Sequence, residues 1–258
     1  DNFKDTDYIF ISQQSLPSYA TYFMHDITLF DIFISTQYKQ YQNFNLMANY
    51  KGLNFQIPQV LKHHDYTLIN RSQSNYAKTG INEKGFLTEL ETPFLENSYL
   101  YFSYGDLTDR NNKSELTEHY SQFDFQELDL IELHYGFGQQ AFINSIVDNH
   151  ILDTTLSLSD TSYIQSIIET QSTFYKSSTK DSPLYTHSTL KYALSSFASV
   201  ALLYETTSED TQDRYNWFGF QLDLSIFKQS SMTIFSGARK AGKSCLGGVC
   251  IYRPEFEG

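Results

Sequence analysis

Apolar and polar residues alternate with a period of two along much of this chain, and this alternation constrains its fold more than any other feature. In the clearest case, Phe218, Phe220, Leu222, Leu224 and Ile226 alternate with Gly219, Gln221, Asp223 and Ser225. Successive side chains of a β-strand point to opposite faces, so this segment predicts a strand with one apolar and one polar face. Its length is close to the roughly 9–11 residues of a membrane-crossing β-strand.

Similar runs predict strands along most of the chain. They cover residues 28–36, 44–51, 53–57, 86–90, 99–104, 122–135, 151–158, 164–175 and 185–194. Only residues 139–149 also fit a short helix. No repeat of fixed period and no Pro- or Gly-rich linker divides the chain, which favours a single β-barrel domain over residues 1–258.

Short and long connections alternate between the predicted strands. Residues 195–196 and 228–231 suit tight hairpins, whereas residues 105–118, 205–214 and those from Gly237 onward are predicted to be long polar loops. Outer-membrane barrels have short turns at one end and long loops at the other. The predicted fold class is therefore all-β: an antiparallel up-and-down transmembrane β-barrel, or the C-terminal part of a larger one. A soluble exported β-sandwich is the alternative, since a soluble meander has the same alternation.

Aromatic residues are frequent, with 20 Tyr and 21 Phe in the chain. Transmembrane barrels carry aromatic girdles at both membrane interfaces, and their outward strand faces contact lipid. We therefore expect Tyr215 and Trp217, which come just before the strand, to be girdle residues. The residues expected to face outer-membrane lipid are Phe218, Phe220, Leu222, Leu224 and Ile226.

The net charge of −12 disfavours nucleic acid as a partner, because nonspecific binding to phosphates depends on Lys and Arg. The longest apolar stretch, Phe197–Tyr204, is far shorter than the roughly 18 residues that a spanning helix requires. Composition thus excludes a helical membrane protein.

The segment Gly237–Ser244 matches the G-x-x-x-x-G-K-[ST] pattern of a P-loop. A P-loop needs a helix that begins at Lys243 and Ser244, so that backbone N–H groups converge on the phosphates. Two adjacent glycines and then Pro254 follow, and they do not favour a helix. We therefore expect a basic loop here and no bound nucleotide.

The two cysteines are Cys245 and Cys250. Their spacing fits neither a C-x-x-C motif nor a zinc site without nearby His. Gly247 and Gly248 would let the chain turn back and bring the two Cα atoms within the roughly 7 Å that a disulfide tolerates. We predict a disulfide, which for so short a loop stabilises the protein by only about 2 kcal/mol and implies an exported protein.

Catalytic patterns are weak. Glu89 with Glu91, and Glu127 with Asp129, would each share one face of a strand, but acidic residues at every second position are also typical of a water-filled lumen. No nucleophile elbow is present, and the histidines do not have the spacing of metal ligands. We predict no catalytic residue, no cofactor and no metal site.

Three segments resemble a group of outer-membrane β-barrel proteins of unknown function from Bacteroidota. They are residues 240–258, which contain K-A-G-K-S-C-L-G-G-V-C, residues 56–68 and residues 82–85. The resemblance implies a barrel in the bacterial outer membrane and a chain that continues at both ends. It implies no activity for particular residues.

Together these features predict a protein without enzymatic activity in the bacterial outer membrane. It would act as a pore, or as a structural or partner-docking component of a cell-surface uptake or secretion assembly, with other outer-membrane or surface proteins as partners. The alternative β-sandwich would bind carbohydrate or protein.

Overall fold

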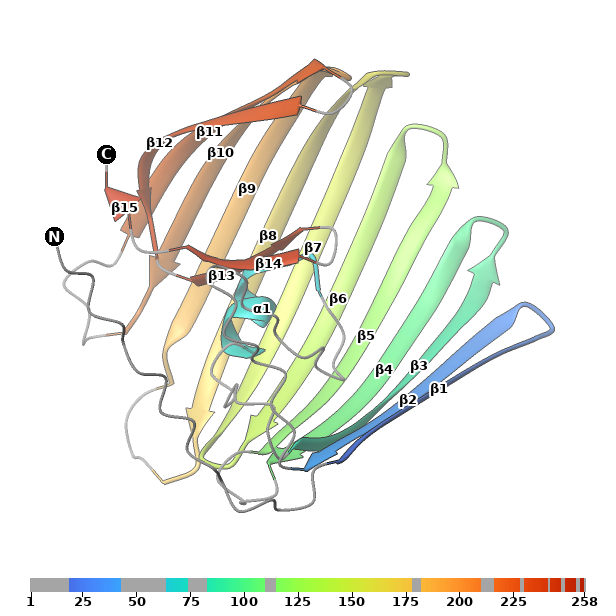
Figure 1. Ribbon diagram of the computed structural model, residues 1–258. Helices are drawn as coiled ribbons and strands as arrows, with labels where there is room; N and C mark the ends of the chain where they lie inside the picture. Colours follow the sequence, from blue (N-terminus) through green and yellow to red (C-terminus); the bar gives the residue numbers. More distant parts are fainter. Residues whose placement is uncertain are drawn as a thin grey trace, which may run out of the picture.

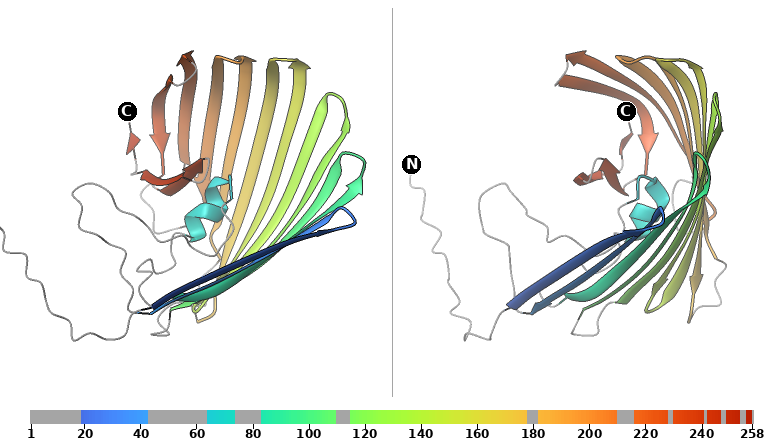
Figure 2. Two further views of the ribbon diagram at one scale, coloured as in Figure 1. Left: turned by 45° about the vertical axis from the view of Figure 1, so that its right-hand side comes forward. Right: turned by 90° about the vertical axis from the view of Figure 1, so that its right-hand side faces the viewer.

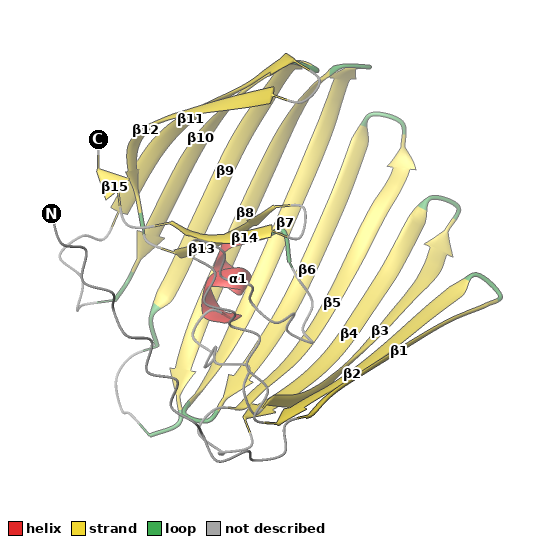
Figure 3. Ribbon diagram, viewed as in Figure 1, coloured by secondary structure: helices red, strands yellow, loops and turns green. Residues whose placement is uncertain are grey.

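The computed structural model describes residues 19–42, 64–73, 83–109, 115–177, 182–209, 216–227, 230–240, 242–246, 249–253 and 256–257. Nearly all of them are in β-strands, and the helix α1 (Thr67–Gln73) is drawn in red in Figure 3. The strands are β1 (Tyr19–Leu29), β2 (Ile32–Gln42), β3 (Glu83–Leu95), β4 (Ser98–Asp109), β5 (Glu115–Leu128), β6 (Ile131–Phe142), β7 (Ser145–Ser159), β8 (Ser162–Tyr175), β9 (Leu184–Ser195), β10 (Ala198–Thr207), β11 (Asn216–Phe227), β12 (Ser230–Arg239), β13 (Gly242–Leu246), β14 (Val249–Arg253) and β15 (Phe256–Glu257).

One large sheet dominates the structure. Strands β1 to β12 pair in sequence order, each antiparallel to the next, and β15 pairs with β12 at the far edge (Figure 1). The sheet is strongly curved (Figure 2). It is also open, because β1 pairs only with β2 among the described strands. Helix α1 and the separate hairpin β13–β14 lie on the concave side (Figure 2). We call the concave side of the sheet its inner face and the convex side its outer face.

This architecture confirms the all-β antiparallel up-and-down prediction. The expected β-sandwich alternative is wrong, since the described strands form one large sheet and one hairpin instead of two sheets packed face to face. No helix within the described ranges is long and apolar enough to cross a membrane.

Six of the predicted runs lie within single strands. They are residues 86–90, 99–104, 151–158, 164–175, 185–194 and 218–226. Residues 44–51 and 53–57 lie outside the described residues.

Three local predictions are wrong, and each missed a hairpin. Residues 28–36 turn at Phe30 and Asp31, which adopt left-handed φ angles of 51° and 67° without the usual Gly or Asn signal. Residues 122–135 turn at 129–130, between β5 and β6. Residues 139–149 form part of the β6–β7 hairpin instead of a helix.

The connections follow the predicted alternation. At one end of the sheet all six are two residues long, at 30–31, 96–97, 129–130, 160–161, 196–197 and 228–229. At the other end they are mostly longer, at 43–82, 110–114, 143–144, 176–183 and 208–215, with 143–144 as the exception. The loop predicted at 105–118 is shorter than expected, because β4 runs to Asp109 and β5 begins at Glu115. We call the two ends the short-turn end and the long-loop end.

Strand β11 has the two faces that its sequence predicts, but Trp217 was assigned to the wrong one. Phe218 is 58% exposed on the outer face, whereas Trp217 is only 2% exposed on the inner face. A girdle residue would face outward, so the prediction for Trp217 is wrong. Trp217 is adjacent to Phe218, so its side chain points to the opposite face from the apolar residues of β11. Tyr215 and the side chain of Ile226 lie outside the described residues.

An apolar band runs across the outer face of the sheet in the half nearer the short-turn end. Its members are Ile27, Leu29, Ile32, Ile34, Leu90, Phe94, Leu100, Phe102, Phe123, Phe125, Ile131, Leu133, Tyr135, Leu152, Leu156, Leu158, Ile164, Ile168, Leu190, Tyr192, Leu194, Val200, Leu202, Phe220, Leu222, Leu224, Met232 and Ile234. We call this set the outer band. It is continuous across strands, as in the register neighbours Tyr135, Leu152 and Ile168.

The outer band is free of charge. The outer-face positions between two band members on one strand are Thr92, Thr154 and Ser166. Nearer the long-loop end, the same face carries charged residues such as Lys84 and Asp106. The outer face therefore divides into a charge-free apolar half and a half in which charged residues lie among aromatic ones such as Phe218.

The hairpin β13–β14 contains both cysteines. Cys245 and Cys250 are direct partners in its antiparallel register. Directly opposed residues in such a pair have Cα atoms about 4.5–5.5 Å apart, within the range of a disulfide. The cysteine side chains lie outside the described residues, so the disulfide stays a prediction.

We expect the purified protein to contain no free thiol without reductant. Titration with a thiol reagent under denaturing conditions measures this directly, and prior reduction should release two thiols per chain, since the sequence has two cysteines. Two thiols in the protein that has not been reduced would contradict the disulfide.

Candidate functional site

Helix α1 lies against the inner face and contacts β6, β7, β8 and β9, as well as β13. It has seven residues, of which Leu68, Ile69, Asn70, Ser72 and Gln73 are buried. Isolated helices shorter than about 12–15 residues are marginal in water. The contacts with the sheet, described next, are therefore what hold this segment in a helix.

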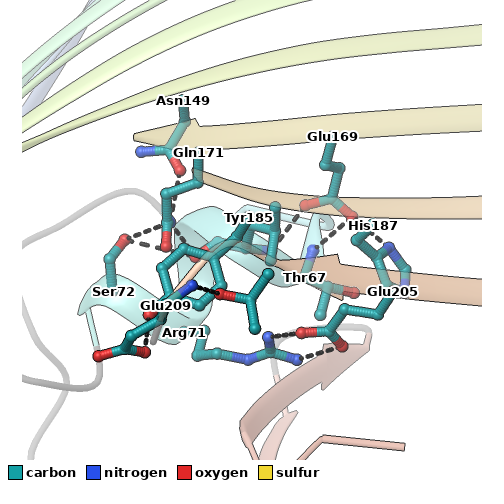
Figure 4. Close-up of polar contacts among 12 residues, drawn as sticks. Thr67, Arg71, Ser72, Asn149, Glu169, Gln171, Tyr185, His187, Glu205 and Glu209 are labelled. Carbon is teal, nitrogen blue, oxygen red and sulfur yellow. Dashed lines mark hydrogen bonds and ion pairs between the residues drawn. The ribbon is translucent and has the colours of Figure 1, made fainter. Parts of the chain in front are cut away.

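Glu169 of β8 caps the N-terminus of α1. The backbone N–H of Thr67 donates to Oε1 (3.0 Å; Figure 4) and that of Leu68 donates to Oε2 (2.6 Å). The first N–H groups of a helix have no partner within it, and a carboxylate also favours the positive end of the helix dipole. His187 of β9 lies 3.0 Å from Oε1 through its Nδ1. The buried Glu169 carboxylate is thus occupied by α1 and by the sheet.

Two amide side chains of the sheet bond to the middle of α1. Gln171 donates to the backbone oxygen of Leu68 (2.8 Å) and to Asn149 Oδ1 (2.7 Å). Gln140 donates to the backbone oxygen of Ile69 (3.3 Å) and accepts a hydrogen bond from the Ser72 hydroxyl. These bonds fix the rotation of α1 about its axis, because they reach both its backbone and its side chains.

Glu118 of β5 links the two ends of the α1 segment. Its Oε1 lies 3.0 Å from Nε2 of His64, before the helix, and its Oε2 accepts from Gln73 (2.8 Å), the last helical residue. Gln140 also donates to Oε2 (2.5 Å). A buried carboxylate is costly unless its acceptor sites are filled, and here three donors fill them.

Arg71 of α1 forms an ion pair with Glu205 of β10. Nη2 of Arg71 donates to Oε2 of Glu205 (3.1 Å), and Nη1 donates to Oε1, so the guanidinium meets the carboxylate with two parallel bonds. Such bidentate pairs are stronger and more directional than single ones. The pair attaches α1 to a strand beyond the four that it packs against.

The apolar contact of the site is made by Ile69, which packs with Tyr120 and Ile151 in a buried cluster. Gly138 provides the space, since a Cβ there would lie 2.6 Å from Cδ1 of Ile69. Tyr66, just before the helix, packs against the same cluster, and burial raises the pKa of its hydroxyl, which therefore stays neutral.

The carboxylates that the sequence singled out lie in different surroundings. Asp129 lies in the β5–β6 turn instead of on a strand beside Glu127. Glu127 accepts from the Ser98 hydroxyl and the Asn97 N–H at the short-turn end. Glu89 and Glu91 do share the inner face, and Glu89 accepts from the Tyr101 hydroxyl. In the part of the chain that the structure describes, no three His, Cys, Asp or Glu residues are arranged to hold a metal ion.

The segment that resembles a P-loop is extended. Strand β12 continues to Arg239 and β13 begins at Gly242, so Lys243 and Ser244 lie in a strand and not at the start of a helix. The long loop predicted from Gly237 onward is therefore wrong, because most of the described residues there pair in strands. Gly237 has a φ of +118° and its backbone lies close to Phe218, which explains a glycine at this position without reference to phosphate.

The sequence did not identify the residues that hold α1. Glu118, Glu169, Gln171 and Glu205 each alternate with outward residues, so a polar strand face was predictable. Their common partner α1 was not predictable, because it lies far from them in the sequence: Arg71 of α1 and Glu205 are 134 residues apart. Buried polar residues at every second position of several strands were the one available signal.

We predict that Glu169→Gln loosens the start of α1, since a neutral amide cannot accept two backbone hydrogen bonds with both of its terminal atoms. Loss of one charge-assisted bond of about 1.5–3 kcal/mol should speed amide exchange of Thr67 and Leu68 by roughly tenfold or more. Hydrogen exchange followed over residues 67–73 measures the effect.

Glu91→Gln is the matched control, because Glu91 is an exposed carboxylate on the inner face of β3. It should leave exchange in α1 unchanged. Equal protection of α1 in the two variants would contradict the capping role of Glu169.

Comparison of the chain with protein-family models, with curated proteins and with solved structures finds no match. The function is therefore inferred from the sheet and from the residues that hold α1.

Proposed function

We propose that the protein is a bacterial outer-membrane β-barrel protein without enzymatic activity, and that it acts as a pore narrowed by α1. The observation that carries the proposal is the contrast between the faces of the sheet. The outer band has no charged member, whereas the inner face holds Glu118, Glu169 and Glu205. Transmembrane barrels have this pattern of apolar residues outside and polar residues inside.

The strands are long enough to cross a bilayer. Strands β3 to β12 have 10 to 15 residues each, against the roughly 9–11 that a tilted transmembrane strand needs. The outer band occupies only the half nearer the short-turn end, and the half that carries charged residues would extend beyond the membrane. In outer-membrane barrels the short turns face the periplasm and the longer loops face the outside. The resemblance of residues 240–258 to a Bacteroidota outer-membrane family supports the same location.

A barrel wall in lipid cannot leave a strand edge unpaired, since no water is present to bond the free N–H and C=O groups. Strand β1 has one free edge within the described sheet. In the membrane this edge would pair with a further strand and close the wall. The same edge suits a structural or docking role, in which another outer-membrane protein supplies the pairing.

Helix α1 determines what kind of pore is expected. It is held on the inner face by polar bonds to four strands. The bonding side chains are Glu118 of β5, Gln140 of β6, Glu169 and Gln171 of β8, and Glu205 of β10. Some barrels are water-filled and others are partly closed by an internal loop or helix. We assign this protein to the second kind.

Leu222→Arg should destabilise the protein by roughly 2–4 kcal/mol in lipid if position 222 lies near the midplane. Leu222 belongs to the outer band and is flanked by Val200 and Ile234 in the register. Denaturant unfolding in phospholipid vesicles measures the loss.

The control is Asp223→Arg, on the next residue and the inner face. It should be much milder, because the inner face is in contact with water. Equal effects of the two substitutions, or a β-rich protein that is monodisperse without detergent, would contradict the membrane assignment.

The pore is tested by conductance in planar bilayers. Ile69→Asp places a charge in the apolar cluster with Tyr120 and Ile151, so it should release α1 and increase single-channel conductance. Ile69→Leu conserves the apolar contact and should behave like the unmodified protein. Absence of conductance in all three proteins would refute the pore and leave only a structural role.

A further inference from the structure

A second part of the inner face has a different character from the α1 site. A hollow of about 780 Å³ lies near the short-turn end and spans β7 to β12. Its lining includes Ser157 of β7 and Asp223 of β11, whereas the residues of β7 and β8 that bind α1 are Asn149, Glu169 and Gln171, nearer the long-loop end. The hollow is therefore separate from the contacts that hold the helix.

Hydroxyl groups dominate the lining of this hollow. Four serines on the strands that line it make no side-chain hydrogen bond to any described residue: Ser157, Ser199, Ser225 and Ser231. Each hydroxyl can donate one hydrogen bond and accept others. Four strands thus present hydroxyls, free to bind a ligand, to one volume.

Two charged residues on the strands that line the hollow, Lys191 and Asp223, already have partners within it. Nζ of Lys191 lies 5.7 Å from the ring centroid of Tyr163. The Asp223 carboxylate accepts from Gln221 Nε2 (3.0 and 2.9 Å) and from the Thr233 hydroxyl (2.7 Å). A further carboxylate, Asp160, lies in the exposed β7–β8 turn at the rim. The lining does not favour an anion, because Lys191 is its one cationic residue and two carboxylates, Asp160 and Asp223, lie beside it. The Asp223 carboxylate has less capacity left for a cation, because neutral donors already bond to it.

We propose that this hollow binds a neutral polyhydroxylated molecule, a mono- or oligosaccharide. Sugar hydroxyls match serine hydroxyls as both donors and acceptors. The volume lies within the roughly 300–1,000 Å³ of small-molecule sites. The proposal rests on the proposed function, in which the inner face lines the lumen, and it names the class of solute that would pass.

Calorimetric titration of the full chain in detergent with glucose, maltotriose and diacetylchitobiose tests the proposal without requiring conduction. We expect at least one of these saccharides to bind. Replacing all four of these strand serines by alanine should weaken that binding by roughly tenfold or more, since the hydrogen bonds that their hydroxyls make to the sugar are lost.

The matched control is Ser166→Ala with Ser188→Ala, which removes two hydroxyls from the outer faces of β8 and β9. It should leave binding unchanged. No binding by any of the three saccharides, or equal binding by the fourfold variant, overturns the proposal. Conductance without saccharide binding refutes only this site, whereas saccharide binding without conductance refutes only the pore.

Discussion

The structure depends on one constraint, the fixed register of twelve consecutive antiparallel strands. Because side chains alternate between faces with a period of two, a shift of one residue in any strand would exchange its two faces. The register aligns Tyr135 with Leu152 and Ile168 on the outside. On the inside it gathers Glu118, Glu169 and Glu205 around one helix. The outer band and the site that holds α1 are two consequences of the same strand pairing.

Helix α1 and the inner face stabilise each other. A seven-residue helix needs tertiary contacts to form, and buried carboxylates need donors to be tolerated. Glu169 provides acceptors for the first N–H groups of the helix, while Arg71 provides a charge for Glu205. Removal of one partner leaves the other buried and unsatisfied, which costs more than the bond itself contributes. The polar network therefore determines the position of α1 as well as its stability.

The inner face has two zones with different chemistry. Near the long-loop end, buried carboxylates are bonded by α1 and by the residues around it, as in the three donors that meet Glu118. Near the short-turn end, hydroxyls such as Ser199 and Ser225 line an open hollow. A narrowing at one level and a neutral, hydroxyl-rich wall at another are what the proposed pore requires, and both are built from inward positions of neighbouring strands.

The sequence by itself determined the strands and their two faces, because a period of two in the apolar residues is a local property of the chain. It determined the alternation of short and long connections for the same reason, and it missed hairpins such as Phe30–Asp31 where no Gly or Asn marked the turn. Only the tertiary structure decided that Trp217 faces inward and that the residues after His64 form a helix on the inner face. It also decided which carboxylates hold that helix. These features depend on contacts between segments about a hundred residues apart, as between Leu68 and Glu169, and the local pattern contains no information about such pairings.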